Sequence, residues 1–253
     1  MTETLWVLMA GVAAGALNAV GGGGTFIALP ALVQAGLPPV TANASATIAL
    51  VPGAAAGAWV YRRDMAPVGG VSVPRLAAAS ACGGLAGAVL LLLLPARSFD
   101  VAVPWLLAGA TLLLLSRDRL AAWAAGAAAG PVRRGSGAVL GGQFLLSVYG
   151  GYFGGAVGIM MLALWGAGLG LDPADGNPMR IVLVAAVYLS SAGVFLAASD
   201  ALSEPVPLAA MLGGAAAGGF GGAHLARRLP ARVLRGVIAS TAVIMTAAYV
   251  SRG

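Results

Sequence analysis

Charged residues are scarce in this sequence: they make up 9% of its 253 residues, whereas 60% are hydrophobic. Soluble domains carry about 25% charged residues, so this composition excludes an ordinary soluble protein and predicts an integral membrane protein. Lysine is absent, and all 14 basic residues are arginine against 8 acidic residues. Arginines at helix ends are explained by anionic lipid and the positive-inside rule, so the basic charge does not indicate nucleic-acid binding.

Cysteine and histidine are each present once, as Cys82 and His224. A single cysteine excludes an internal disulfide and a thiolate cluster, and a single histidine leaves no second imidazole for a metal site. The sequence also lacks a nucleophile elbow, a phosphate-binding Gly-Lys-Ser/Thr loop and any carboxylate inside an apolar run. We therefore predict no catalytic residue, no metal and no cofactor, and expect that the protein is not an enzyme.

Glycine is abundant, with 39 residues, and one glycine-rich stretch occurs twice. Adding 134 to the residue numbers of the first copy gives the second. The matched pairs are Gly21 and Gly155, Gly24 and Gly158, Gly36 and Gly170, Pro39 and Pro173, and Asn43 and Asn177. The sequence therefore predicts two related transmembrane repeats, at 1–116 and 135–253, joined by a cytoplasmic linker at 117–134.

Two apolar runs are too short to cross a membrane alone. A span needs about 20 apolar residues, but 24–35 and 158–170 are shorter, each following a glycine cluster and ending at a Gly-Leu pair. We interpret them as half-helices. The predicted fold is an all-α membrane protein in which each repeat has a glycine-broken hairpin or half-helix pair followed by three transmembrane helices.

The arginines distinguish two topologies. If each broken segment crosses once, the 14 arginines divide 8 to 6 between the two sides. If each broken segment returns as a hairpin, only Arg97 and Arg252 lie apart and the division is 12 to 2. The positive-inside rule favours the hairpin, with both termini outside. The repeats would then be inverted, as in many secondary transporters.

The broken segments are the candidate binding site. Irregular backbone at membrane depth must be buried or line a polar space, and a helix N-terminus attracts anions. Two such termini are predicted to converge on one anion near the midplane. The residues of this prediction are Gly21, Gly22, Gly23, Gly24 and Thr25 in the first half and Gly155 to Gly158 in the second. The alternative is that these glycines serve close helix packing only.

Polar side chains follow each half-helix. Asn43 and Asn177 are either helix N-caps or amides that reach the hairpin tips or the substrate, and Ser45 and Thr47 add hydroxyls. Arg180 is an expensive intramembrane charge that pairs with an acidic residue, extends to the interface or binds an anion. The first half has Ala46 at that place, so the site is asymmetric.

Three tyrosines, Tyr149, Tyr152 and Tyr188, lie in or opposite the second broken segment, and Gln143 lies one to two turns earlier. These side chains supply hydrogen bonds in a cavity, or the tyrosines are interfacial anchors.

Three runs together resemble the TauE/SafE, or sulfite exporter, family of membrane transporters: GGGGTFIALPAL, ANASATIALVPGAAAGAWVYRRD and GGYFGGAVGIMMLALWGAGLGL. The resemblance covers nearly the full length. It marks the glycine clusters, with Gly151 and Gly154 in the second, and also Asn43, Ser45, Thr47, Tyr152, Asn177 and Arg180. Arg180 stands at a place where relatives often have Lys. Tyr188 departs from the family, whose members often have Asn in that region.

The resemblance implies transport of a small anion, often sulfite or a sulfonate, across the bacterial cytoplasmic membrane. We accordingly expect a secondary-type carrier whose partners are an anion and the lipid bilayer, with the coupling ion and homo-oligomerisation left open. The alternatives are an anion channel, or a membrane enzyme or assembly subunit without transport activity.

Overall fold

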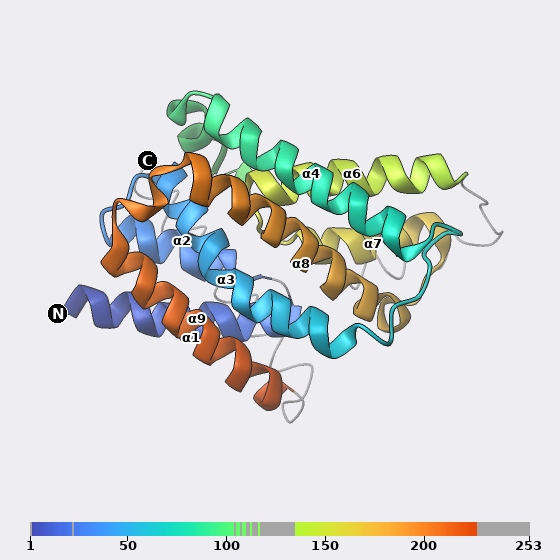
Figure 1. The fold of residues 1–253 in the computed structure, drawn as a ribbon, viewed down its shortest axis with the longest axis horizontal. Coiled ribbons are helices and arrows are strands. Elements are labelled where there is room, and N and C mark those ends of the chain that lie inside the picture. Colours follow the sequence, from blue (N-terminus) through green and yellow to red (C-terminus); the bar gives the residue numbers. More distant parts are fainter. Residues whose placement is uncertain are drawn as a thin grey trace.

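The structure is a computed structural model that describes residues 2–21, 23–103, 105–106, 108–109, 112, 116 and 135–226. Within these residues it contains helices and no β-strand, so the all-α class is confirmed. The helices are α1 (Thr2–Gly21), α2 (Thr25–Gln34), α3 (Pro39–Tyr61), α4 (Val73–Leu93), α6 (Ser136–Tyr152), α7 (Val157–Leu169), α8 (Pro173–Ala198), the short 3-10 helix η1 (Asp200–Leu202) and α9 (Pro205–Ala226) (Figure 1). The predicted linker at 117–134 and the apolar run at 233–250 lie outside the described residues.

Helices α2 and α7 are short, as predicted for half-helices. α2 has 10 residues and α7 has 13, against about 20 for a full span. Each ends beside a glycine in the left-handed region, Gly36 at φ 91° and Gly170 at φ 66°. The N–H of the following leucine bonds back to a carbonyl of the last turn, at 3.1 and 3.3 Å. These glycine C-caps confirm the helix ends predicted at the Gly-Leu pairs.

The chain turns back on itself at each break. A Cβ added to Gly24 would lie 2.7 Å from the Ala14 carbonyl oxygen and 2.8 Å from Asn18 Cβ, and one added to Gly150 would lie 2.8 Å from Val157 Cγ2. Ten residues of a continuous helix span about 15 Å, so Gly24 could not lie beside Ala14 unless the chain reversed. α1 with α2, and α6 with α7, are therefore hairpins.

Helices of one half pack mainly against helices of the other. α1 lies along α9, α4 along α6, and α3 along α8. Glycines allow the closest of these approaches: a Cβ on Gly218 would overlap the Val12 backbone, and one on Gly87 would overlap the Val148 backbone. Such contacts are typical of membrane helices, which associate through small residues.

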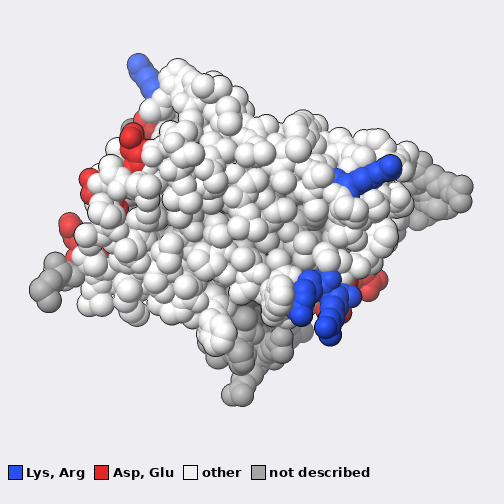
Figure 2. Space-filling view, in the orientation of Figure 1, with Lys and Arg blue, Asp and Glu red and all other residues white. Residues whose placement is uncertain are grey.

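The charged surface supports a membrane-spanning orientation. Figure 2 shows arginines and carboxylates gathered toward the two ends, with an uncharged surface between them. Arg62, Arg63 and Arg75 lie around the turn between α3 and α4, and Arg97 follows the other end of α4. Among the described residues, three helices are long and apolar enough to span a membrane: α3, α4 and the 175–198 part of α8.

Candidate functional site

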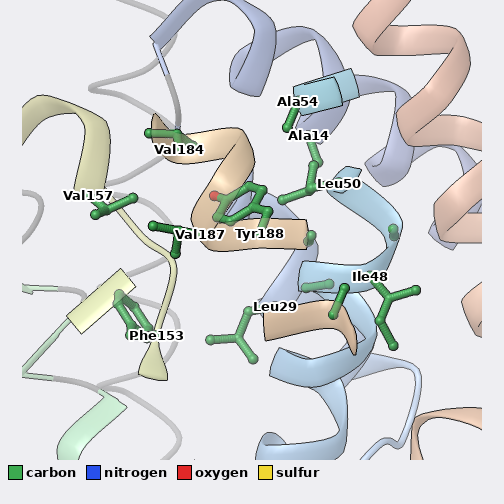
Figure 3. Packing of buried hydrophobic residues seen from close by; sticks show 14 of the residues in the cluster. Ala14, Leu29, Ile48, Leu50, Ala54, Phe153, Val157, Val184, Val187 and Tyr188 are labelled. Carbon is green, nitrogen blue, oxygen red and sulfur yellow. The ribbon is translucent and has the colours of Figure 1, made fainter. Parts of the chain in front are cut away.

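Each hairpin has a tip where the chain reverses. The first tip lies between α1 and α2 and includes Gly23 and Gly24, and the second lies between α6 and α7 at 153–156. The two tips meet inside the protein. Gly154 marks the contact, because a Cβ added there would lie 3.2 Å from Thr25 Oγ1 at the start of α2 and 3.8 Å from Tyr188 Cε1 in α8. Tyr188 is fully buried, and its hydroxyl donates a hydrogen bond to the Gly154 carbonyl at 3.2 Å. In Figure 3 Tyr188 lies between Leu50 of α3 and the turn at 153–157. The structure thus brings Thr25, Gly154 and Tyr188 together and shows that Tyr188 is not an interfacial anchor.

The first tip is held by packing rather than by unusual backbone. Gly21 is the last residue of α1, and Gly22 lies outside the described residues. Gly24 has ordinary helical angles, φ −57° and ψ −33°, yet its missing side chain is required, because an added Cβ would also lie 2.9 Å from Leu50 Cδ2. At Gly23 the nearest atom to an added Cβ would be in the Phe26 ring, at 3.3 Å. The packing alternative therefore holds for Gly24.

The second tip has left-handed backbone at two residues. Gly154 has φ 80°, and Ala156, the N-cap of α7, has φ 59°. A non-glycine residue in this region is strained by its Cβ. A Cβ on Gly155 would lie 2.5 Å from the Phe153 ring, whereas one on Gly151 would overlap the Gly84 backbone of α4. Gly151 is therefore a helix contact, and the tip proper begins after it.

The N-cap interpretation of the two asparagines is wrong. α3 begins at Pro39 and α8 at Pro173, so Asn43 and Asn177 lie inside their helices, past the cap position. The amide alternative is correct for Asn43: it is fully buried, and its Nδ2 donates to the Tyr152 carbonyl at 3.0 Å. This bond joins the first half to the broken segment of the second.

The two hydroxyls on α3 differ in their bonding. Thr47 Oγ1 donates to the Asn43 carbonyl at 3.0 Å, one turn back in its own helix, as buried helical threonines often do. Ser45 is fully buried, and its Oγ has no hydrogen-bond partner among the described residues. Because residues two apart point about 200° apart around a helix, Ser45 lies on a different face from Asn43.

Arg180 lies against the start of α7. It is 4% exposed, so extension to the interface is excluded. Its Nε donates to Asn177 Oδ1 at 3.0 Å, one turn earlier in α8. The guanidinium covers Gly158, where an added Cβ would lie 2.9 Å from Arg180 Nη1. The matched glycines thus have different neighbours: Gly24 meets apolar atoms and backbone, whereas Gly158 meets the cation.

This placement concentrates positive charge at one point. The first turn of α7 carries N–H groups without intrahelical partners and the positive end of the helix dipole. Arg180 adds a full charge beside that turn, and like charges in a low-dielectric interior repel. An anion bound between them would be favoured by both. The arrangement therefore suits binding of a small anion.

Sequence reasoning missed one buried polar side chain, and it did not foresee the partners of a second set, which includes Gln143. The first is Asn18, 9% exposed near the end of α1, whose Oδ1 has no partner within the described part of the chain; its position directly before the glycine cluster was an available signal. The second joins α4 to α6, where Gln143 Nε2 donates to Ser80 Oγ at 2.9 Å. Ser191 of α8 donates to the Gly84 carbonyl at 3.0 Å. These last contacts could not be foreseen, because they depend on helix pairing.

No group of three or more His, Cys, Asp or Glu side chains able to hold a metal occurs in the described ranges. A model of the family described as "Sulfite exporter TauE/SafE" matches residues 7–249, nearly the whole chain. No curated protein and no solved structure matched significantly.

Proposed function

Because the chain belongs to the sulfite exporter TauE/SafE family, a family of membrane transporters for sulfur-containing anions, we propose that it is a secondary carrier of a small sulfur oxyanion or organosulfonate. The anion would bind between the hairpin tips near the membrane midplane. The observation that carries this proposal is the position of Arg180 against the first turn of α7. Two sources of positive charge beside each other in a buried place would together favour the binding of an anion.

The residues that would contact the anion come from both halves. Arg180 and the backbone N–H groups near Gly158 would supply charge and donors, and Thr25 would supply a hydroxyl from the first tip. Asn177 accepts a hydrogen bond from the Arg180 Nε at 3.0 Å, which holds the guanidinium against Gly158 in the first turn of α7. Tyr188 would position the second tip through its bond to the Gly154 carbonyl.

A carrier rather than a channel is favoured by the arrangement of the halves. The first half contains α1 to α4, and the second contains α6 to α9. The first helix of each half packs on the fourth helix of the other half, α1 on α9 and α6 on α4. The third helices, α3 and α8, pack on each other. This pattern is unchanged when the halves are exchanged. In Figure 1 α3 and α8 also run in opposite directions, as inverted repeats require. Inverted repeats whose broken helices meet at one site support alternating access.

The direct test is uptake in proteoliposomes of purified protein, with sulfite, sulfate, thiosulfate, sulfoacetate and a small carboxylate compared. We expect saturable uptake of at least one sulfur anion. Arg180→Gln should lower the affinity for that anion by about 10- to 100-fold, which corresponds to the loss of a hydrogen bond to a charged group. Arg180→Lys should lose less, because it keeps the charge.

Ohmic anion currents without saturation would identify a channel, and no flux of any anion would favour a subunit without transport activity. Equal, small losses in both Arg180 variants would remove Arg180 from the site.

The orientation can be tested separately. In a Cys82→Ser background, a cysteine at Gly70, in the turn between α3 and α4, should react only from the cytoplasm of a bacterial cell. A cysteine at Ser203, after η1, should react only from outside. The two turns follow α3 and α8, which are the equivalent helices of the two halves. In an inverted arrangement these turns lie on opposite sides of the membrane, so reaction of both cysteines from one side would contradict it.

A further inference from the structure

The interior near the first tip contains oxygen lone pairs that an anion, which itself accepts hydrogen bonds, does not satisfy. Asn18 Oδ1 and Asn43 Oδ1 are buried and have no hydrogen-bond partner in the described part of the chain. Thr25 Oγ1 is also buried, and its hydroxyl lies beside the Tyr188 side chain, yet the oxygen accepts no hydrogen bond there. The side chains of Asn18, Thr25 and Asn43 are 9%, 1% and 0% exposed. An amide oxygen can only accept a hydrogen bond or coordinate a cation. Leaving such an oxygen without a partner costs about 1–3 kcal/mol, so these three atoms indicate a ligand.

The three residues border the same part of the molecule. Asn18 and Thr25 are both neighbours of Gly24, because a Cβ added to Gly24 would lie 2.8 Å from Asn18 Cβ and Thr25 follows Gly24 in the chain. Thr25 and Asn43 both meet the second tip, Thr25 at Gly154 and Asn43 at the Tyr152 carbonyl. That bond uses Nδ2, so the free atom of Asn43 is its oxygen.

The chemistry of these atoms selects the ligand. Hard oxygen donors suit alkali and alkaline-earth cations, and Ca²⁺ and Mg²⁺ sites in proteins use carboxylates. Asn18, Thr25 and Asn43 carry no charge and no titratable group. α1 also ends here, with no basic residue in its last turn, and the C-terminus of a helix bears partial negative charge. These features favour a monovalent cation over a divalent one or a proton.

We propose that Asn18 Oδ1, Thr25 Oγ1 and Asn43 Oδ1 form a sodium site at the first hairpin tip, beside the anion at the second. This inference deepens the proposed function by naming the coupling ion. Opposite charges a few ångströms apart attract strongly in a low-dielectric interior. A sodium ion would therefore raise the affinity for the anion, and the anion would raise the affinity for sodium by the same factor.

The site can be tested without transport. The melting temperature of detergent-purified protein is measured in increasing NaCl, with KCl and choline chloride at equal ionic strength and with no added sulfur anion. Binding to the folded state alone raises stability in a saturable manner, so NaCl should raise the melting temperature above the other two salts. Identical curves in all three salts would overturn the proposal.

Variants locate the site. Thr25→Val keeps the side-chain shape but removes the hydroxyl, and should raise the half-saturating sodium concentration about tenfold, as loss of one polar contact to a charge does. Thr25→Ser keeps a hydroxyl and should retain near-normal sodium affinity. The matched control is Ser191→Ala, which removes a buried hydroxyl bonded to Gly84 of α4 and should leave the sodium response unchanged. A normal response in Thr25→Val would contradict the assignment.

Proteoliposomes then separate this inference from the proposed function. An inward sodium gradient should drive sulfite accumulation that a potassium gradient does not. Saturable sulfite uptake that ignores sodium, or follows only a pH gradient, would overturn the sodium site and leave the anion carrier intact. Sodium-dependent stabilisation without uptake of any anion would leave the site and overturn the carrier.

Discussion

The two hairpin tips use the same chain reversal for different purposes. At the first tip, Gly24 has ordinary helical angles and is needed because α1 and α3 leave no room for a side chain. At the second tip, Gly154 and Ala156 are left-handed, and the matched Gly158 lies under Arg180. The comparison teaches that a repeated sequence motif can keep its path through the membrane while its chemistry diverges. The first tip presents neutral oxygens, and the second presents positive charge.

The largest loss of stability is expected from Gly24→Ala. An added Cβ would lie within 3 Å of two backbone or side-chain atoms of α1 and of Leu50 in α3, and overpacking of this kind costs about 1–3 kcal/mol. The melting temperature and the yield of monodisperse protein should fall. Gly70→Ala, at an open turn in the left-handed region, is a control for backbone cost without crowding. Normal stability of Gly24→Ala would show that the first tip is looser than its contacts indicate.

Gly158→Ala should act on the anion instead of on the fold. The added methyl would lie 2.9 Å from Arg180 Nη1, the end of a flexible side chain that can move aside. We expect anion affinity to fall about tenfold, with a melting temperature near that of the unchanged protein. A matched loss of stability in Gly24→Ala and Gly158→Ala would break the proposed division between packing and binding.

A smaller effect is expected from Tyr188→Phe, which removes the hydroxyl that donates to the Gly154 carbonyl. Loss of one such bond costs about 1 kcal/mol. The second tip should become less ordered, so proteolysis or hydrogen exchange of 153–157 should increase while that of 23–25 does not. Equal changes at both tips would show that they are coupled more tightly than one contact implies.

The smallest effect is expected from Ala156→Gly. Glycine removes the strain of the left-handed conformation, which should increase the free energy of unfolding by about 1–2 kcal/mol. Loss of the buried methyl group should decrease it by about 0.8 kcal/mol. The melting temperature should stay the same or rise slightly. A clear decrease would mean that the Ala156 methyl contributes packing that outweighs its strain, and the second tip would then resemble the first.

The helices themselves followed from the amino-acid sequence. Long apolar runs with few charges form helices in a membrane, because a helix pairs its backbone polar groups within its own segment. The half-helix lengths and the Gly-Leu ends depend on local backbone chemistry, so they could be predicted residue by residue. The doubled motif and the glycine clusters also carried the family resemblance, which the match over 7–249 confirmed.

Tertiary structure decided what each motif does. Asn43 could be a cap or a bridge from sequence alone, and only the approach of the Tyr152 carbonyl decided it. Gly24 and Gly158 have the same place in the repeat, yet their neighbours come from different helices, and those neighbours give one a packing role and place the other beneath a charge. Spacing along a chain reports local conformation, whereas burial and electrostatics depend on which helices pack together, and this pairing is set by contacts between residues far apart in sequence.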